Sequence, residues 1–167
     1  MSTLEEYLKS NDVNQTPREV FLSYVQKNGK DLEHVPVNRR DFELCMTALK
    51  NDKEFSYHFI LSLVPNECYN DTLVDFVVEN TSGERYFLFT FPEKFLTYER
   101  CMKLVYVSNG LELRDVPEEI KTYDMCLKSV QLSEGETLEY VPMKFRDRNM
   151  CLTALRSCQD THEASLI

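Results

Sequence analysis

The chain has 167 residues, of which 43% are hydrophobic and 28% are charged, and its formal net charge is −9. This composition is typical of a globular protein that is long enough to bury a core, and it excludes disorder of the whole chain. A surface of this sign repels phosphate backbones and anionic lipids, so we expect neither direct nucleic-acid binding nor membrane insertion.

The amino-terminal sequence bears on the compartment in which the protein folds. Residues 1–6 contain no basic segment followed by an apolar stretch, as a cleaved secretory signal would, and no apolar run approaches membrane-spanning length. We therefore expect a cytoplasmic, reducing compartment, in which the six cysteines stay thiols. Non-classical secretion into a host cell stays open, because such signals need not resemble classical ones.

The first predicted elements precede any regular pattern. Residues 1–15 are expected to form a degenerate N-terminal cap of the fold. Thr16, Pro17 and Glu19 then have the order of a capping box with proline at the first helical position, which predicts that a helix begins there.

From residue 32 onward, one pattern recurs around five prolines at spacings of 29, 27, 25 and 25 residues. Each proline follows an apolar residue and has a leucine four residues before it. A small apolar residue lies nine residues after each proline (the +9 position), and Leu or Val lies thirteen residues after it (the +13 position). The prolines are Pro36, Pro65, Pro92, Pro117 and Pro142, and the +9 residues are Cys45, Val74, Cys101, Cys126 and Cys151.

Each unit of about 25 residues is predicted to contain two short helices. The proline suits the first turn of a short helix, and a capping residue then begins a second helix. Val20 extends the +9 series backwards by one member. A glycine lies nine residues after several members of this series, and such a glycine would end the second helix in a left-handed conformation. The capping residues are Asp41, Asn70, Thr97, Thr122 and Asp147, and the glycines are Gly29, Gly83, Gly110 and Gly135.

Two short helices cannot bury their apolar faces alone, but stacked units can. We therefore predict an all-α fold: a tandem helical-repeat array, similar to an α-solenoid, with about six short repeats in a single domain over residues 1–158. Residues 159–167 lack the pattern and are predicted to be a flexible tail. A local β-hairpin around residues 72–91 stays open, because residues 72–79 and 85–91 are rich in β-forming side chains and a Thr-Ser-Gly turn separates them.

The segment 109–127 has the order Asn-Gly-Leu-x-Leu-x-x-Val-Pro-Glu-Glu-Ile-x-Thr, followed by a cysteine four residues later. It resembles a short two-helix tandem repeat family of unknown function, found in giant-virus proteins and in proteins and candidate effectors of intracellular bacteria. The resemblance is good over residues 27–49 and 98–158 and poor over 51–86. It implies a repeat architecture and a host–parasite setting, and it carries no catalytic residues.

The cysteines are predicted to pack rather than to react. No two of them form the C-x-x-C pair that zinc sites usually require, and four of them share the +9 position, which holds valine elsewhere. Cys68 also replaces a larger apolar residue of the other units. Cys158, near the predicted tail, is the thiol that we expect to be exposed. We expect no bound metal and no cofactor.

The sequence also lacks the motifs of common enzymes. It has no Gly-rich phosphate loop, no metalloprotease helix and no Ser-centred elbow. We therefore predict that the protein is not an enzyme and has no catalytic residues. A thiol-dependent enzyme that uses Cys158 or His34 is the remote alternative.

The candidate binding residues depart from the pattern of their neighbours. Tyr86, Phe87 and Phe89 make the third proline-centred repeat, around Pro92, unusually aromatic. The positions equivalent to Phe87 and Phe89 hold mostly polar residues, so we expect both rings to be exposed interface anchors. His34 and Tyr140 share a position, two residues before the proline, whose varied occupants also predict exposure.

These observations predict a non-catalytic protein–protein interaction module whose partner is another protein. The resemblance implies a secreted effector or an effector-associated adaptor. The alternative is an acidic inhibitor, or nucleic-acid mimic, that occupies a basic cleft, although the negative charge is not gathered into long blocks. The identity of the partner and the oligomeric state stay open.

Overall fold

The computed structural model describes residues 3–52, 57–81 and 90–164, with the backbone alone for 159–164. Every regular element in these ranges is an α-helix or a 3₁₀ helix, and none is a strand. This confirms the all-α fold class. The chain divides into two compact units, residues 1–79 and 80–167, and each unit is described here by itself.

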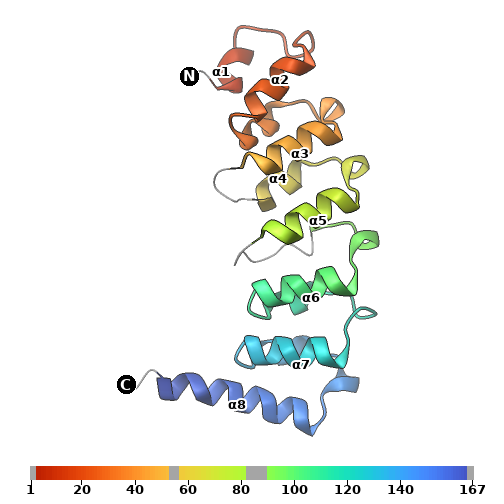
Figure 1. Cartoon of the computed structure of the whole chain (residues 1–167), viewed down its shortest axis with the longest axis vertical. Helices are drawn as coiled ribbons and strands as arrows, with labels where there is room; N and C mark the ends of the chain where they lie inside the picture. The colour runs from red at the N-terminus through yellow and green to blue at the C-terminus, as the bar shows by residue number, and fades with distance from the viewer. Residues whose placement is uncertain (1–2, 53–56, 82–89, 165–167) are drawn as a thin grey trace. The chain divides into compact units, whose positions relative to one another are not determined.

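The first unit contains short α-helices joined by 3₁₀ segments (Figure 1). The α-helices are α1 (Leu4–Leu8), α2 (Arg18–Val25), α3 (Phe42–Lys50), α4 (Tyr57–Leu63) and α5 (Asp71–Asn80). The 3₁₀ segments are η1 (Gly29–His34), η2 (Val37–Arg39) and η3 (Asn66–Cys68). Phe21, Leu32 and Leu44 are fully buried in the core of this unit.

Helix α1 covers the amino-terminal side of η1. Thr3 caps it with a capping box, because its side chain accepts a hydrogen bond from the Glu6 N–H while the Glu6 carboxylate accepts one from the Thr3 N–H. Leu4 is fully buried, and α1 packs against η1. The residues expected to cap the fold therefore bury apolar surface of the first unit.

The capping box predicted at Thr16 is wrong. Pro17, with an extended backbone, is the N-cap of α2, and no side chain caps this helix. The hydroxyl of Thr16 instead donates to the carbonyl oxygen of Asp12 at 2.9 Å, within the preceding turn. The N-cap position falls one residue after Thr16, at Pro17, whose side chain has no oxygen that could cap the helix.

The β-hairpin considered for residues 72–91 is also wrong in its first arm. Residues 71–80 form α5, and Leu73, Val74, Val77 and Val78 are buried along one side of it. Their spacing fits one face of a helix, and burial of that face outweighs the strand preference of valine. Most of the turn and most of the second arm lie in residues 82–89, outside the described residues.

The second unit stacks three α-helices side by side, with 3₁₀ segments between them (Figure 1). The α-helices are α6 (Tyr98–Val107), α7 (Tyr123–Leu132) and α8 (Arg148–Ala164). The 3₁₀ segments are η5 (Glu93–Phe95), η6 (Leu111–Asp115), η7 (Glu136–Tyr140) and η8 (Met143–Phe145). Helix α8 continues through residue 164, beyond Gln159, where the flexible tail was predicted to begin.

The predicted helix boundaries are confirmed at most of the marked positions. In each of five helices the capping side chain accepts a hydrogen bond from the backbone N–H three residues later; these residues are Asp41, Asn70, Thr97, Thr122 and Asp147. Gly110 and Gly135 follow α6 and α7 with φ of 89° and 90°, as left-handed helix stops. The same prediction is wrong at Gly29, whose φ is not positive, and Gly83 lies outside the described residues. The tandem-repeat arrangement of the whole chain stays a prediction.

Removal of one cap should weaken the second unit measurably. We expect Thr122→Ala to lower the free energy of unfolding by about 1 kcal/mol, because the Met125 N–H loses its acceptor. Thr122→Ser keeps the hydroxyl and should restore most of the loss. Urea denaturation followed by circular dichroism measures both variants, and an alanine variant as stable as the wild type would contradict the capping role.

Candidate functional site

The clearest irregularity of the surface is at the +9 and +13 positions of the second unit. In α6 and α7 these positions are fully buried; they hold Cys101, Val105, Cys126 and Val130. In α8 they hold Cys151, which is exposed, and Leu155, which is 63% exposed. The apolar residues at these positions therefore belong to the core in α6 and α7 but are exposed to solvent in α8.

The layer that follows each inner helix explains this difference. Helix α6 packs against η6 and α7, and α7 packs against η7 and α8. The 3₁₀ segments and the residues after them contribute Leu113, Val116 and Val141, which are all buried. Helix α8 is the last described element, so no described layer covers its outer face.

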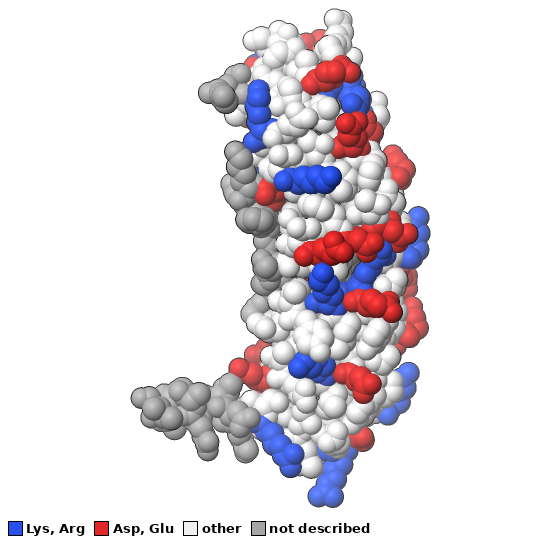
Figure 2. Space-filling model, viewed as in Figure 1, with Lys and Arg blue, Asp and Glu red and all other residues white. Residues whose placement is uncertain are grey.

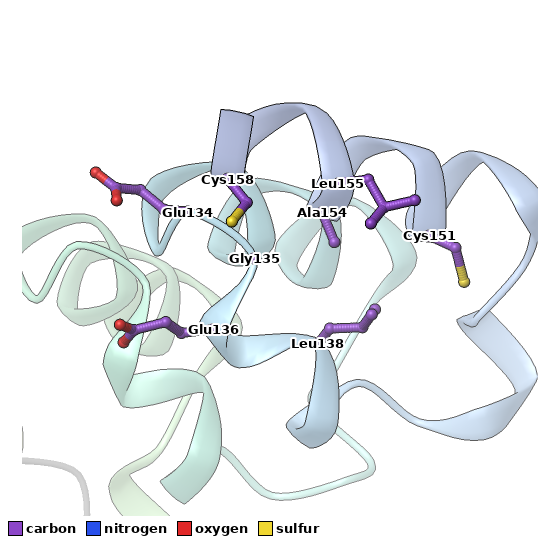
Figure 3. Close-up of a pocket in the computed structure, with 8 residues that line it drawn as sticks. All are labelled: Glu134, Gly135, Glu136, Leu138, Cys151, Ala154, Leu155 and Cys158. Carbon is purple, nitrogen blue, oxygen red and sulfur yellow. The ribbon is translucent and has the colours of Figure 1, made fainter. Parts of the chain in front are cut away.

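The outer face of α8 forms one wall of an apolar groove (Figure 3). The cavity has a volume of about 520 Å³ and is lined by Glu134, Gly135, Glu136, Leu138, Cys151, Ala154, Leu155 and Cys158. Gly135 brings η7 close to the helix, because a Cβ atom at this position would lie 2.8 Å from the carbonyl oxygen of Ala154. We call this cavity the α8 groove.

The lining of the α8 groove is apolar except for Glu134 and Glu136. Arg148, Cys151, Leu155 and Cys158 are spaced by three, four and three residues, so they share one face of the helix. Arg148 is exposed at the amino-terminal end of this face. Glu134 and Glu136 are exposed beside Cys158, at the other end (Figure 3).

The cysteines behave as predicted with one exception. Cys45, Cys101 and Cys126 are fully buried, and burial raises the pKa of the first two to about 12 and that of Cys126 to about 11. Cys68 is also buried, and Cys158 is exposed as expected. The prediction that Cys151 is buried is wrong, because the layer that covers its equivalents is not repeated beyond α8 in the described chain.

Thiol labelling should separate these two groups. At about pH 8 we expect an aromatic disulfide reagent to modify Cys151 and Cys158 rapidly in the native protein, because the other four thiols are buried. All six should react once the protein is denatured. Cys151→Ser should remove one rapid equivalent, whereas rapid reaction of a third thiol in the wild type would contradict the burial of the +9 cysteines.

The aromatic binding residues were predicted in the third proline-centred repeat, around Pro92. Tyr86, Phe87 and Phe89 lie outside the residues that the structure describes. The positions equivalent to Phe87 were expected to be exposed, but the residues there are all buried: Asp31, Ile60, Glu112 and Thr137. The equivalents of Phe89 are all exposed, namely Glu33, Ser62, Arg114 and Glu139.

Hydrogen bonds explain why one of these polar residues, Thr137, is buried at the position equivalent to Phe87. The hydroxyl of Thr137 lies 2.7 Å from that of Ser129 and 2.9 Å from that of Ser133. The Ser129 hydroxyl also donates to the carbonyl oxygen of Gly110 at 2.8 Å. A polar residue at this position is therefore part of the packing and does not indicate a solvated surface.

His34 and Tyr140 are half-buried, as are the other residues at their shared position. His34 lies in the first unit, with Nε2 3.4 Å from a carboxylate oxygen of Glu33. Tyr140 lies in the second unit, where a hydrogen bond with Glu139 raises the pKa of its hydroxyl. Because the two residues belong to separate units, nothing described joins them in one site.

The α8 groove was not among the sequence-based predictions, although one signal was present. Cys151, Leu155 and Cys158 are spaced by four and three residues, so they widen the apolar face that Met150 and Ala154 begin.

Other kinds of site are not evident in the described ranges. No group of three or more His, Cys, Asp or Glu side chains there could hold a metal ion. None of the described helices has the length and apolar character needed to cross a bilayer. Comparisons with protein-family models, curated proteins and solved structures find no match to this chain.

Proposed function

We propose that the chain is a non-catalytic protein–protein interaction module, built as a tandem helical-repeat array, and that it binds a protein through the α8 groove. One observation carries this proposal. Leu155 is 63% exposed, whereas Val105 and Val130, which hold the same position in α6 and α7, are fully buried. Leu155 is therefore an apolar residue at a core position of the pattern whose side chain is in contact with solvent.

The chemistry of the α8 groove suits a protein ligand. Covering a leucine side chain contributes about 1.5–3 kcal/mol, so Leu155 could supply a large part of a moderate binding energy. Glu134 and Glu136 in the lining, with Arg148 outside it at the start of α8, would form the polar rim that surrounds the apolar centre of most interfaces. Contiguous apolar surface with such a rim commonly marks an interaction site.

We rank the acidic inhibitor second. A nucleic-acid mimic needs a continuous row of negative charge, but acidic and basic side chains are interspersed on the face shown in Figure 2. Ion pairs also neutralise several carboxylates locally, including Asp41 and Glu43 with Arg18, both at 2.6 Å, and Glu118 with Lys121 at 2.9 Å. The role of effector or adaptor rests on the family resemblance alone.

Affinity capture with matched variants tests the proposal. The baits are the wild type, Leu155→Arg and Met143→Arg, and the last is a control because Met143 is 77% exposed but does not line the α8 groove. We expect Leu155→Arg to lose proteins that the wild type and the control both retain, because an unpaired charge would be buried at the contact. Equal capture by all three baits, with unchanged circular dichroism, would contradict the assignment of the groove.

A further inference from the structure

We propose that the α8 groove binds the α8 groove of a second copy of this chain, with the two α8 helices antiparallel about a two-fold axis. This inference rests on the proposed function, because it names the protein that covers the same surface. A two-fold contact uses one self-complementary patch on both copies and closes as a dimer.

The spacing along α8 is suited to such a contact. The intervals of three, four and three residues from Arg148 to Cys158 place these side chains along one face of the helix, as in the contact face of two paired helices. Cys151 and Cys158 lie equally far from the midpoint between Ala154 and Leu155. The proposed two-fold axis lies at that midpoint, so that Cys151 of one copy is opposite Cys158 of the other and the two Leu155 side chains are adjacent between them.

The charges select the antiparallel direction. Arg148 lies at one end of this face of α8, and Glu134 and Glu136 lie beside the other end. Antiparallel helices bring Arg148 of each copy towards the two glutamates of the other, whereas parallel helices would place arginine beside arginine. Two chains of net charge −9 repel one another in general, so local complementarity of this kind is needed to favour one face.

The remaining exposed apolar residues offer no better match to the groove. Val37, at 61% exposure, and Met143, at 77%, are the other aliphatic side chains more than half exposed in the described ranges, and each lies singly on a 3₁₀ turn. At the amino-terminal side of the first unit, α1 buries Leu4 completely. In a head-to-tail contact, the groove of one copy would therefore meet either an isolated apolar side chain of the other copy or the surface of α1, whose Leu4 is already buried. The α8 helix of a second copy instead offers a continuous row of apolar side chains.

Sedimentation velocity over a wide range of concentrations tests the dimer. We expect the wild type and Met143→Arg to dimerise and Leu155→Arg to stay monomeric. Arg148→Glu should raise the dissociation constant by about tenfold, and the further changes Glu134→Arg and Glu136→Arg in the same chain should restore association. Failure of this charge exchange to restore association, or a dimer that persists in Leu155→Arg, would overturn the proposed contact.

Chemical cross-linking tests the direction of the helices. In the antiparallel contact each short bismaleimide link joins Cys151 to Cys158 of the other copy. The wild type should therefore cross-link under native conditions, and both Cys151→Ser and Cys158→Ser should abolish the cross-link. In a parallel contact, either single variant would still be linked through its remaining exposed cysteine, which would contradict the proposal.

The outcomes separate this inference from the proposed function. A monomeric wild type that still captures a protein, lost with Leu155→Arg, would overturn the second copy as the occupant and leave the interaction module standing. A monomeric wild type whose captured proteins are the same with Leu155→Arg would overturn both.

Discussion

Replacement of Val130 by serine should lower the free energy of unfolding by about 3 kcal/mol, whereas replacement of Leu155 by serine should change it by less than about 0.5 kcal/mol in the monomer. The two residues hold the same position in successive helices. Val130 is fully buried, so its loss leaves a cavity and places a hydroxyl in an apolar core. Leu155 is 63% exposed, so its removal takes little surface out of the core.

Equilibrium denaturation in urea measures both variants. It should be carried out at low protein concentration, because binding of a second copy would add to the apparent stability of the wild type. A large loss with Leu155→Ser under these conditions would show that α8 is covered within the monomer, and the α8 groove would then not be a surface. An unchanged Val130→Ser variant would contradict the packing of α7 against η7 and α8.

Gly110→Ala should destabilise the protein by about 2 kcal/mol or more. The backbone at this residue has φ of 89°, a left-handed conformation that disfavours a side chain. A Cβ atom would also meet the carbonyl oxygen of Ser129, so α7 would have to shift away from the turn after α6. Both effects act in the same direction, and thermal unfolding followed by circular dichroism measures their sum.

Asn109→Gly provides the matched control for this prediction. Asn109 is the neighbouring residue, is exposed and also has a positive φ, of 52°. Glycine adopts this conformation without steric cost, so we expect the free energy of unfolding to change by less than about 1 kcal/mol. Equal destabilisation by both variants would show that the turn tolerates no substitution, and the specific role of Gly110 would be wrong.

The local structure was largely predictable because its signals lie within a few residues of one another. A capping side chain acts on an N–H three residues away, as at Thr122, and a left-handed glycine ends the helix directly before it, as at Gly110. The prediction at Thr16 failed because the helix begins one residue later than the pattern indicated, so its N-cap is Pro17, which has no capping oxygen in its side chain. Helix α5 differed from the hairpin because burial of its valines depends on neighbours distant in sequence.

The candidate site was not predictable in the same way. Cys151 and Cys126 occupy the same position and are the same residue type, yet only Cys126 is buried. Exposure depends on whether a further layer packs against the helix, and no property of the residue itself records this. The position of Phe87 shows the converse error, because the polar residue Thr137 at the equivalent position is buried in a hydrogen-bonded cluster.

The most direct test of the central claim is photo-crosslinking from the α8 groove itself. A photoreactive phenylalanine analogue would be placed at position 155 in one variant and at position 143 in another. Both positions are exposed, but only Leu155 lines the groove. A protein-binding groove predicts a discrete cross-linked species from position 155, to a second copy or to another protein, and none from position 143. Absence of any cross-linked protein from position 155, in lysate and in the purified protein, would contradict it.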